Sequence, residues 1–267
     1  MRQNIFGMVK AVFFDIDGTL VSFKTHQVPE SAVEAIRKAR EKGVMVFIAT
    51  GRPLTLLDVV KELDYDGVIS TNGAYIVTKD LQPIYKHPIS REDMSRLADY
   101  VKTTPLPMML VAEDRLMGYG FENADESVLE VFRLVNMALP PSSDIEEVRH
   151  MDILQVVAFF TSEQESAIMN NVLTGCDANR WHPAFADCIP HGVCKATGID
   201  QVCKYYGIPL EQTMAFGDGG NDIEMLRHVG IGVAMGNASD EVKAAADIVT
   251  TSVDEDGVAK ALMRVLG

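Results

Sequence analysis

Short apolar runs alternate with amphipathic stretches along the N-terminal part of the chain. Residues 12–14 (Val-Phe-Phe) form an uninterrupted apolar run, which is typical of a strand buried on both faces of a parallel sheet. Apolar residues at helical spacing follow between Pro29 and Gly43, and residues 44–49 form a second apolar run. Because strand, helix and parallel strand wind into an open sheet, this order predicts a Rossmann-like, doubly wound α/β core.

The pattern continues to residue 70 and then changes. Pro53 is expected to start a helix that runs to residue 63, and residues 67–70 are expected to form a third buried strand. Beyond them, residues 75–77 and 84–85 are apolar or aromatic and are separated by polar residues. This spacing predicts a hairpin at the edge of the sheet.

Residues 90–187 show a different order of predicted helices and strands. The order predicted there is a helix, paired strands at 108–111 and 115–119, a helix, a strand at 153–160 and a helix. Ser90 and Ser162 are each followed three residues later by an acid, as at a capped helix start. The segment is expected to form an antiparallel sheet with helices on one face, which is an α+β unit.

After residue 190 the first pattern returns. A helix over residues 193–206, a strand over 212–216 and a strand over 231–235 are predicted, with a helix from Asn221 between the two strands. We therefore expect one core domain, formed by residues 1–83 and 190–267. Residues 84–189 are expected to form an inserted second domain.

Composition and charge exclude several classes of partner. The 267 residues carry a formal net charge of −14, which argues against binding to nucleic acid or to an anionic membrane. No apolar run approaches the length of about 18 residues that a spanning helix needs, and no signal peptide is evident. The four cysteines show no disulfide or zinc spacing, which favours reduced thiols and a cytoplasmic location. Nothing in the pattern indicates an obligate protein partner.

Two acids end the first predicted strand. Side chains two positions apart on an extended backbone point to the same side, so Asp15 and Asp17 can reach one small volume, and Gly18 lets the chain turn away. Their mutual repulsion would be relieved by a hard divalent cation such as Mg²⁺, which prefers oxygen ligands. The alternative is a solvated acidic turn, because Asp-Gly is common in turns.

A second acidic loop follows the predicted strand at 212–216. Its sequence from residue 217 to 222 is Gly-Asp-Gly-Gly-Asn-Asp. Backbone N–H groups of such a loop can bind an anion while Asp218 or Asp222 faces a cation. The alternative is a glycine-rich turn with surface acids.

Taken together, these segments resemble the haloacid dehalogenase superfamily of phosphatases. The four motifs that carry the resemblance are Asp-Ile-Asp-Gly-Thr-Leu at residues 15–20, Thr-Gly-Arg at 50–52, Lys195 and the acidic loop at 217–222. Thr-Asn-Gly-Ala at residues 71–74 and the insertion between the second and third motifs resemble the Cof-type sugar-phosphate phosphatases. The sequence departs from the family pattern at Cys-Lys-Ala (residues 194–196), where a small residue usually precedes the lysine and glycine follows it.

The resemblance implies a Mg²⁺-dependent phosphatase of small phosphorylated metabolites. It implies that Asp15 attacks phosphorus and becomes phosphorylated, and that Asp17 serves as general acid and then base. Thr50, Gly51, Lys195 and Asn221 would bind the phosphoryl group. Arg52 would bind a second anionic group or pair with an acid.

The metal ligands that the resemblance implies are acidic residues of the two loops. Asp15, the backbone carbonyl of Asp17, and Asp218 would bind the ion. Asp222 would bind it or a water on it, or orient Lys195. The resemblance also implies that the inserted domain, residues 84–189, is a cap domain that selects the substrate.

Two other functions remain open at this point. A phosphomutase of the same fold would pass the phosphoryl group to a second hydroxyl of a sugar. A non-catalytic phosphoryl-accepting switch would also use an aspartate near acids, a threonine and a lysine, although such receivers are about one small domain long.

Overall fold

The computed structural model describes residues 9–134 and 137–267, and they divide into two compact units. We call the described residues up to Tyr85 together with Cys194–Gly267 the core unit, and Lys86–Val193 the inserted unit. The sequence placed these boundaries at 83/84 and 189/190. The N-terminal segment, in which no signal peptide was expected, lies outside the described residues.

The core unit contains a mostly parallel sheet of eight strands in the order β13-β12-β11-β1-β2-β3-β4-β5. From β13 to β3 each pair is parallel, and β4 runs antiparallel to β3. The predicted α/β fold class is thus confirmed. Its strands are β1 (Ala11–Phe14), β2 (Met45–Ala49), β3 (Gly67–Ser70), β4 (Tyr75–Thr78), β5 (Pro83–Lys86), β11 (Thr213–Gly217), β12 (Ile231–Ala234) and β13 (Ile248–Val249).

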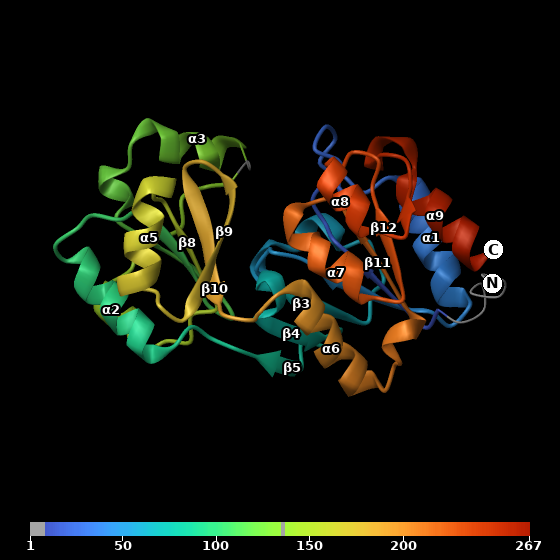
Figure 1. The fold of residues 1–267 in the computed structure, drawn as a ribbon, viewed down its shortest axis with the longest axis horizontal. Helices are drawn as coiled ribbons and strands as arrows, with labels where there is room; N and C mark the ends of the chain where they lie inside the picture. Colours follow the sequence, from blue (N-terminus) through green and yellow to red (C-terminus); the bar gives the residue numbers. More distant parts are fainter. Residues whose placement is uncertain (1–8, 135–136) are drawn as a thin grey trace. The chain divides into compact units, whose positions relative to one another are not determined.

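Helices cover both faces of this sheet. They are α1 (Glu30–Glu41), α6 (Lys195–Tyr206), α7 (Ile223–His228), α8 (Asp240–Ala245) and α9 (Gly257–Leu266). On one face Phe13 and Phe47 stack and share a core with residues of α6, α7 and α8. Val12 and Phe14 alternate to the other face and are fully buried. There α1 contacts both β2 and α9, and Figure 1 shows α1 and α9 side by side.

One predicted helix is absent from the core unit. Residues 53–63 contain two short 3₁₀ turns, Leu54–Leu56 and Asp58–Val60, instead of an α-helix. The Leu56 carbonyl, which an α-helix would pair with the Val60 N–H, accepts a hydrogen bond from Arg52 Nη1 at 3.1 Å. The Val60 N–H donates to Leu57 at 3.0 Å instead, so the chain tightens into 3₁₀ geometry.

The inserted unit contains an antiparallel sheet of five strands in the order β7-β6-β8-β10-β9. Its strands are β6 (Met108–Val111), β7 (Leu116–Tyr119), β8 (Gln155–Ala158), β9 (Cys176–His182) and β10 (Phe185–Pro190). The predicted strand pair and the strand near residue 155 are confirmed. The β9–β10 hairpin was not predicted, because β9 contains none of the β-branched residues that are typical of strands.

The inserted unit also corrects the prediction that helices lie on one face. Its helices are α2 (Arg91–Val101), α3 (Glu126–Leu134), α4 (Ile145–Val148) and α5 (Ser162–Asn171). Residues of α2, α4 and α5 share a core with Met108, Leu110 and Val156, whereas α3 shares a second core with Met109 and Val111. Because Met108 and Met109 point to opposite faces of β6, the two cores lie on opposite sides of the sheet (Figure 1).

Helix starts in the inserted unit agree with the sequence in one case and differ in the other. Ser90 caps α2 by accepting a hydrogen bond from the Asp93 N–H, as predicted. Helix α5 is capped one residue earlier than expected, by Thr161 with Gln164.

No helix among the described residues is both long and apolar enough to cross a membrane.

Candidate active site

Asp15 directly follows β1, beside the point where the order of the core sheet reverses. From β1 the chain builds outward to β2 and β3 on one side, and β11 and β12 lie on the other. Loops diverge at such a point, which is where open α/β sheets place their ligands. The Asp15 N–H donates to the Phe216 carbonyl of β11 at 3.0 Å. This bond holds the buried Asp15 beside the acidic loop that follows β11.

Lys195 is the first residue of α6, and its side chain reaches the same place. It is 1% exposed, and Nζ donates to Asp15 Oδ1 at 2.5 Å and to Asp222 Oδ1 at 2.6 Å. Burial alone would lower the pKa of Lys195, but the two carboxylates outweigh it and raise that pKa above its usual value. Lys195 is therefore a fixed positive charge between two acids. Cys194, which departs from the family pattern, is the residue before this helix.

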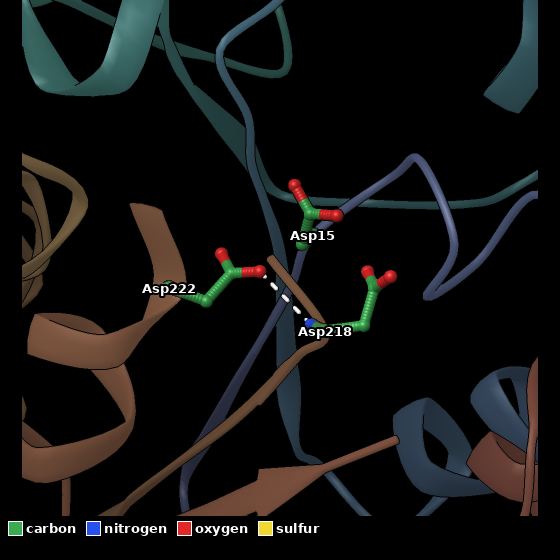
Figure 2. Close-up of side chains that lie close together, drawn as sticks. All are labelled: Asp15, Asp218 and Asp222. Atoms are coloured by element: carbon green, nitrogen blue, oxygen red, sulfur yellow. Dashed lines mark hydrogen bonds between the residues drawn. The ribbon is translucent and has the colours of Figure 1, made fainter. Parts of the chain in front are cut away.

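Three carboxylates gather beside Lys195. One oxygen each from Asp15, Asp218 and Asp222 lie within 4.8 Å of one another, and Figure 2 shows these side chains converging. Burial is the largest cause that raises the pKa of Asp15 well above its usual value, and Asp222 and Asp218 add to this against the opposing effect of Lys195. Burial and repulsion by Asp222 raise the pKa of Asp218 to about 7.

Asp222 is fully buried and has protein donors on both carboxylate oxygens. Oδ1 accepts from Lys195, and Oδ2 accepts from the N–H groups of Asp218 and Gly219 at 3.0 and 2.9 Å. The bond between Asp222 and the Asp218 N–H is drawn in Figure 2. Asp222 thus shapes its own loop and orients Lys195 at the same time.

Two residues that the sequence analysis did not single out hold Asp218. Thr19 Oγ1 donates to Asp218 Oδ1 at 2.9 Å, and Asn237 Nδ2 donates to Asp218 Oδ2 at 3.0 Å and to the Gly18 carbonyl at 2.9 Å. Gly18 has a φ of 86°, and a Cβ at this position would overlap the Asp218 carboxylate. Glycine is therefore required there for both backbone and space.

The Thr-Gly-Arg turn follows β2, the neighbour of β1. Thr50 is 1% exposed, and its hydroxyl accepts a hydrogen bond from the Arg52 N–H at 3.1 Å. Arg52 binds both oxygens of Asp17, with Nε to Oδ2 at 2.7 Å and Nη2 to Oδ1 at 2.6 Å. Of the two alternatives left open for Arg52, the structure shows the pairing with an acid, and that acid is Asp17.

Not every predicted metal residue belongs to the carboxylate cluster. The side chain of Asp17 is paired with Arg52 and is absent from the group of Asp15, Asp218 and Asp222 that the described residues form. That Asp17 offers its backbone carbonyl to the ion stays a prediction. Asn221 lies at the surface of the acidic loop, and its Nδ2 donates to Asn72 Oδ1 at 3.0 Å.

A sequence profile of the haloacid dehalogenase-like hydrolases matches residues 12–262, which is nearly the whole chain. The chain belongs to this family. The match spans both parts of the core unit and the insertion between them, so the resemblance that four short motifs carried is confirmed.

Individual relatives of the haloacid dehalogenase (HAD) type extend over both units. YkrA of Bacillus subtilis (strain 168), which is named as a phosphatase, is 36% identical over 254 residues, or 95% of this chain and 96% of the relative. The structure of the HAD subclass IIB sugar phosphatase BT4131 has 42% identity and a TM-score of 0.85, covering 96% of this chain and 98% of that one. The phosphatase BT1666 of Bacteroides thetaiotaomicron has 38% identity and a TM-score of 0.89, covering 99% and 97%.

These comparisons confirm the predicted enzyme class, a HAD-type phosphatase. This class agrees with the site geometry, in which carboxylates of the loops after β1 and β11 surround Lys195 at the start of α6.

Proposed function

We propose that this protein is a Mg²⁺-dependent phosphatase of small phosphorylated metabolites, with sugar phosphates as the preferred class, and that Asp15 forms an aspartyl phosphate. The observation that carries the proposal is the placement of Lys195 Nζ between Asp15 and Asp222 at the end of β1. A carboxylate can attack a phosphate dianion only where positive charge offsets their repulsion. Lys195 supplies part of that charge.

The donor set fits a divalent cation. When ionised, the three clustered carboxylates carry three negative charges against the one positive charge of Lys195, so two negative charges remain. The raised pKa values of Asp15 and Asp218 are consistent with this missing positive charge. Oxygen ligands favour a hard ion such as Mg²⁺. Asp15, Asp218 and the Asp17 carbonyl would hold it, and when bound it would neutralise phosphoryl oxygens.

The reaction would run in two displacements at phosphorus. In the first, an oxygen of Asp15 forms a bond to phosphorus as the bond to the ester oxygen breaks, and Asp17 gives that oxygen a proton. In the second, Asp17 takes a proton from water, whose oxygen attacks phosphorus and frees Asp15 and inorganic phosphate. Thr50, the Gly51 N–H and Asn221 would bind phosphoryl oxygens in both steps, together with Lys195.

The pairing of Asp17 with Arg52 bears on its proposed role. Both oxygens of Asp17 accept hydrogen bonds from the guanidinium, which fixes the plane of the carboxylate. To donate a proton to the leaving oxygen, Asp17 must hold that proton on an oxygen that now accepts from Arg52. We propose that the first step requires this pair to loosen, so that Arg52 is then able to bind an anionic group of the substrate.

Substrate choice is proposed to depend on the inserted unit, as the cap role predicts. The proposal of a sugar phosphate rests on the 42% identity to the sugar phosphatase BT4131, which covers both units. Four free cysteines support the prediction of a cytoplasmic location.

A panel of phosphate esters, assayed with Mg²⁺ and with EDTA, tests the proposal. Release of inorganic phosphate from hexose or pentose phosphates, lost in EDTA, is expected. No release from any ester would contradict it, and conversion of a hexose phosphate to an isomer without free phosphate would identify a phosphomutase. Asp17→Asn should accumulate acid-stable label from a ³²P ester during rapid quench, because hydrolysis of the aspartyl phosphate lacks its base.

A further inference from the structure

The turn after β3 carries unusual backbone strain beside the candidate active site. Thr71 has a φ of 47° and Asn72 a φ of 54°, and both residues are buried. A β-branched residue with positive φ, such as Thr71, is a rare outlier, whereas asparagine adopts positive φ more readily. Thr71 Oγ1 is buried without a hydrogen-bond partner among the described residues. Such costs persist where the surrounding structure requires the conformation, commonly at functional sites.

Backbone hydrogen bonds tie this turn to the Thr-Gly-Arg turn after β2. The Asn72 N–H donates to the Thr50 carbonyl at 3.0 Å, and the Thr71 N–H donates to the Arg52 carbonyl at 3.1 Å. The Asn72 amide fills the space beside Gly51, since a Cβ on Gly51 would lie 3.2 Å from Asn72 Nδ2. The strain therefore places the amide of Asn72 against the segment proposed to bind phosphate.

A second hydrogen bond carries Asn72 across the sheet. Asn221, from the loop after β11, donates from Nδ2 to Asn72 Oδ1 at 3.0 Å. In the sheet order β11-β1-β2-β3 these two loops belong to strands three places apart, or roughly 14 Å at the usual strand spacing. Their side chains can meet only above the ends of β1 and β2. Asp15 and Thr50 lie at those two strand ends.

The direction of this hydrogen bond orients the Asn72 amide. Because Oδ1 accepts from Asn221, Nδ2 presents its two N–H groups elsewhere, and none of the described residues accepts from them. We propose that Asn72 is a phosphate-binding residue, with Nδ2 donating to the phosphoryl group held at Thr50 and Gly51 while Oδ1 orients Asn221. This inference rests on the proposed phosphatase function.

Calorimetric titration with inorganic phosphate in saturating Mg²⁺ tests it without turnover. The variants are Asn72→Gly, which accepts the positive φ and so keeps the turn, Asn221→Ala and the double variant. Loss of a donor to a charged group should weaken phosphate binding by roughly tenfold or more in Asn72→Gly. Asn171→Ala, an exposed asparagine of α5, is the matched control and should bind as wild type does.

The double variant separates direct binding from orientation. If Asn72 donates to phosphate, Asn72→Gly weakens binding further when Asn221 is already alanine. If Asn72 only orients Asn221, the second change has no effect, and the proposal is overturned. Wild-type-like binding by Asn72→Gly also overturns it, whereas a wild-type protein that neither binds phosphate nor hydrolyses any ester contradicts the phosphatase proposal itself.

Discussion

The two units of this protein use buried acids differently. In the core unit Asp15, Asp222 and Lys195 form a buried charged cluster at the end of parallel strands. In the inserted unit Asp93 of α2 is also buried, at 1% exposed. It accepts a hydrogen bond from the Gly175 N–H, which ties α2 to the start of β9, and another from Arg96 of its own helix. Within residues 9–134 and 137–267, the one cluster of three potential metal ligands lies in the core unit.

The direction of the strands explains this difference. In a parallel sheet every carboxyl end meets the same edge, so loops after β1, β2, β3 and β11 converge there. In an antiparallel sheet neighbouring strands end at opposite edges, so polar residues at successive strand ends are separated. The edge of the core sheet thus concentrates chemistry, whereas the buried acid of the inserted unit, Asp93 of α2, stabilises structure.

Asp15→Asn should have the largest effect, a loss of at least about 10³-fold in turnover, because an amide cannot attack phosphorus. Circular dichroism and thermal unfolding should show an intact fold. Asp93→Asn is the matched change in the inserted unit and should retain turnover while lowering stability. Equal turnover of the two variants would break the contrast.

Lys195→Met should abolish most activity and also destabilise the core unit. Removing the one cation leaves Asp15 and Asp222 buried and uncompensated, which typically costs about 3–5 kcal/mol. Denaturant unfolding measures this cost. Lys204→Met, at an exposed position of the same helix, is the control and should change stability little. An unchanged unfolding midpoint in Lys195→Met would show that the buried charges are compensated in another way.

Asp218 should make the free energy of unfolding of the metal-free protein depend on pH, and Mg²⁺ should offset this dependence. Its folded pKa of about 7 exceeds the usual 3.8, so between these values the folded state binds more protons than the unfolded state. Stability of the metal-free protein should therefore fall as pH rises from about 4 to 7. Added Mg²⁺ should raise the melting temperature more at pH 8 than at pH 5, because protons compete with the ion.

The matched variants for this prediction are Asp218→Asn and Asp240→Asn. Loss of both pH effects is expected in the first, and retention is expected in the second, which changes an exposed acid of α8. A Mg²⁺-induced shift of the same size at both pH values would refute the assignment.

Phe132→Ala should have the smallest effect on chemistry. Phe132 packs on Phe121 and Phe159 in the α3 core of the inserted unit, and its truncation should cost about 3–5 kcal/mol. The inserted unit should then unfold earlier, while the heat of Mg²⁺ binding to the core unit stays unchanged at low temperature. A loss of Mg²⁺ affinity in this variant would show that metal binding by the core unit depends on the stability of the inserted unit.

The succession of core strands along the chain, and the acids that follow them, could be predicted from the sequence. Residues 12–14 and 44–49 reveal buried parallel strands because burial on both faces leaves an unbroken apolar run, and this is a local property. Asp15, Thr50 and Asp218 were found because each follows such a run. The family motifs then connected them with Lys195, whose surroundings no local pattern describes.

The partners of these side chains are seen only in the tertiary structure. Arg52 donates hydrogen bonds to Asp17 and to the Leu56 carbonyl, and two 3₁₀ turns lie where a helix was predicted over residues 53–63. Both faces of β6 are buried because α3 covers the second face, which the sequence analysis did not predict. Asn72 and Asn221 lie 149 positions apart in the sequence, so no local pattern predicts that their side chains meet. Hydrophobic periodicity reports burial locally, whereas a hydrogen-bond partner depends on the path of the whole backbone.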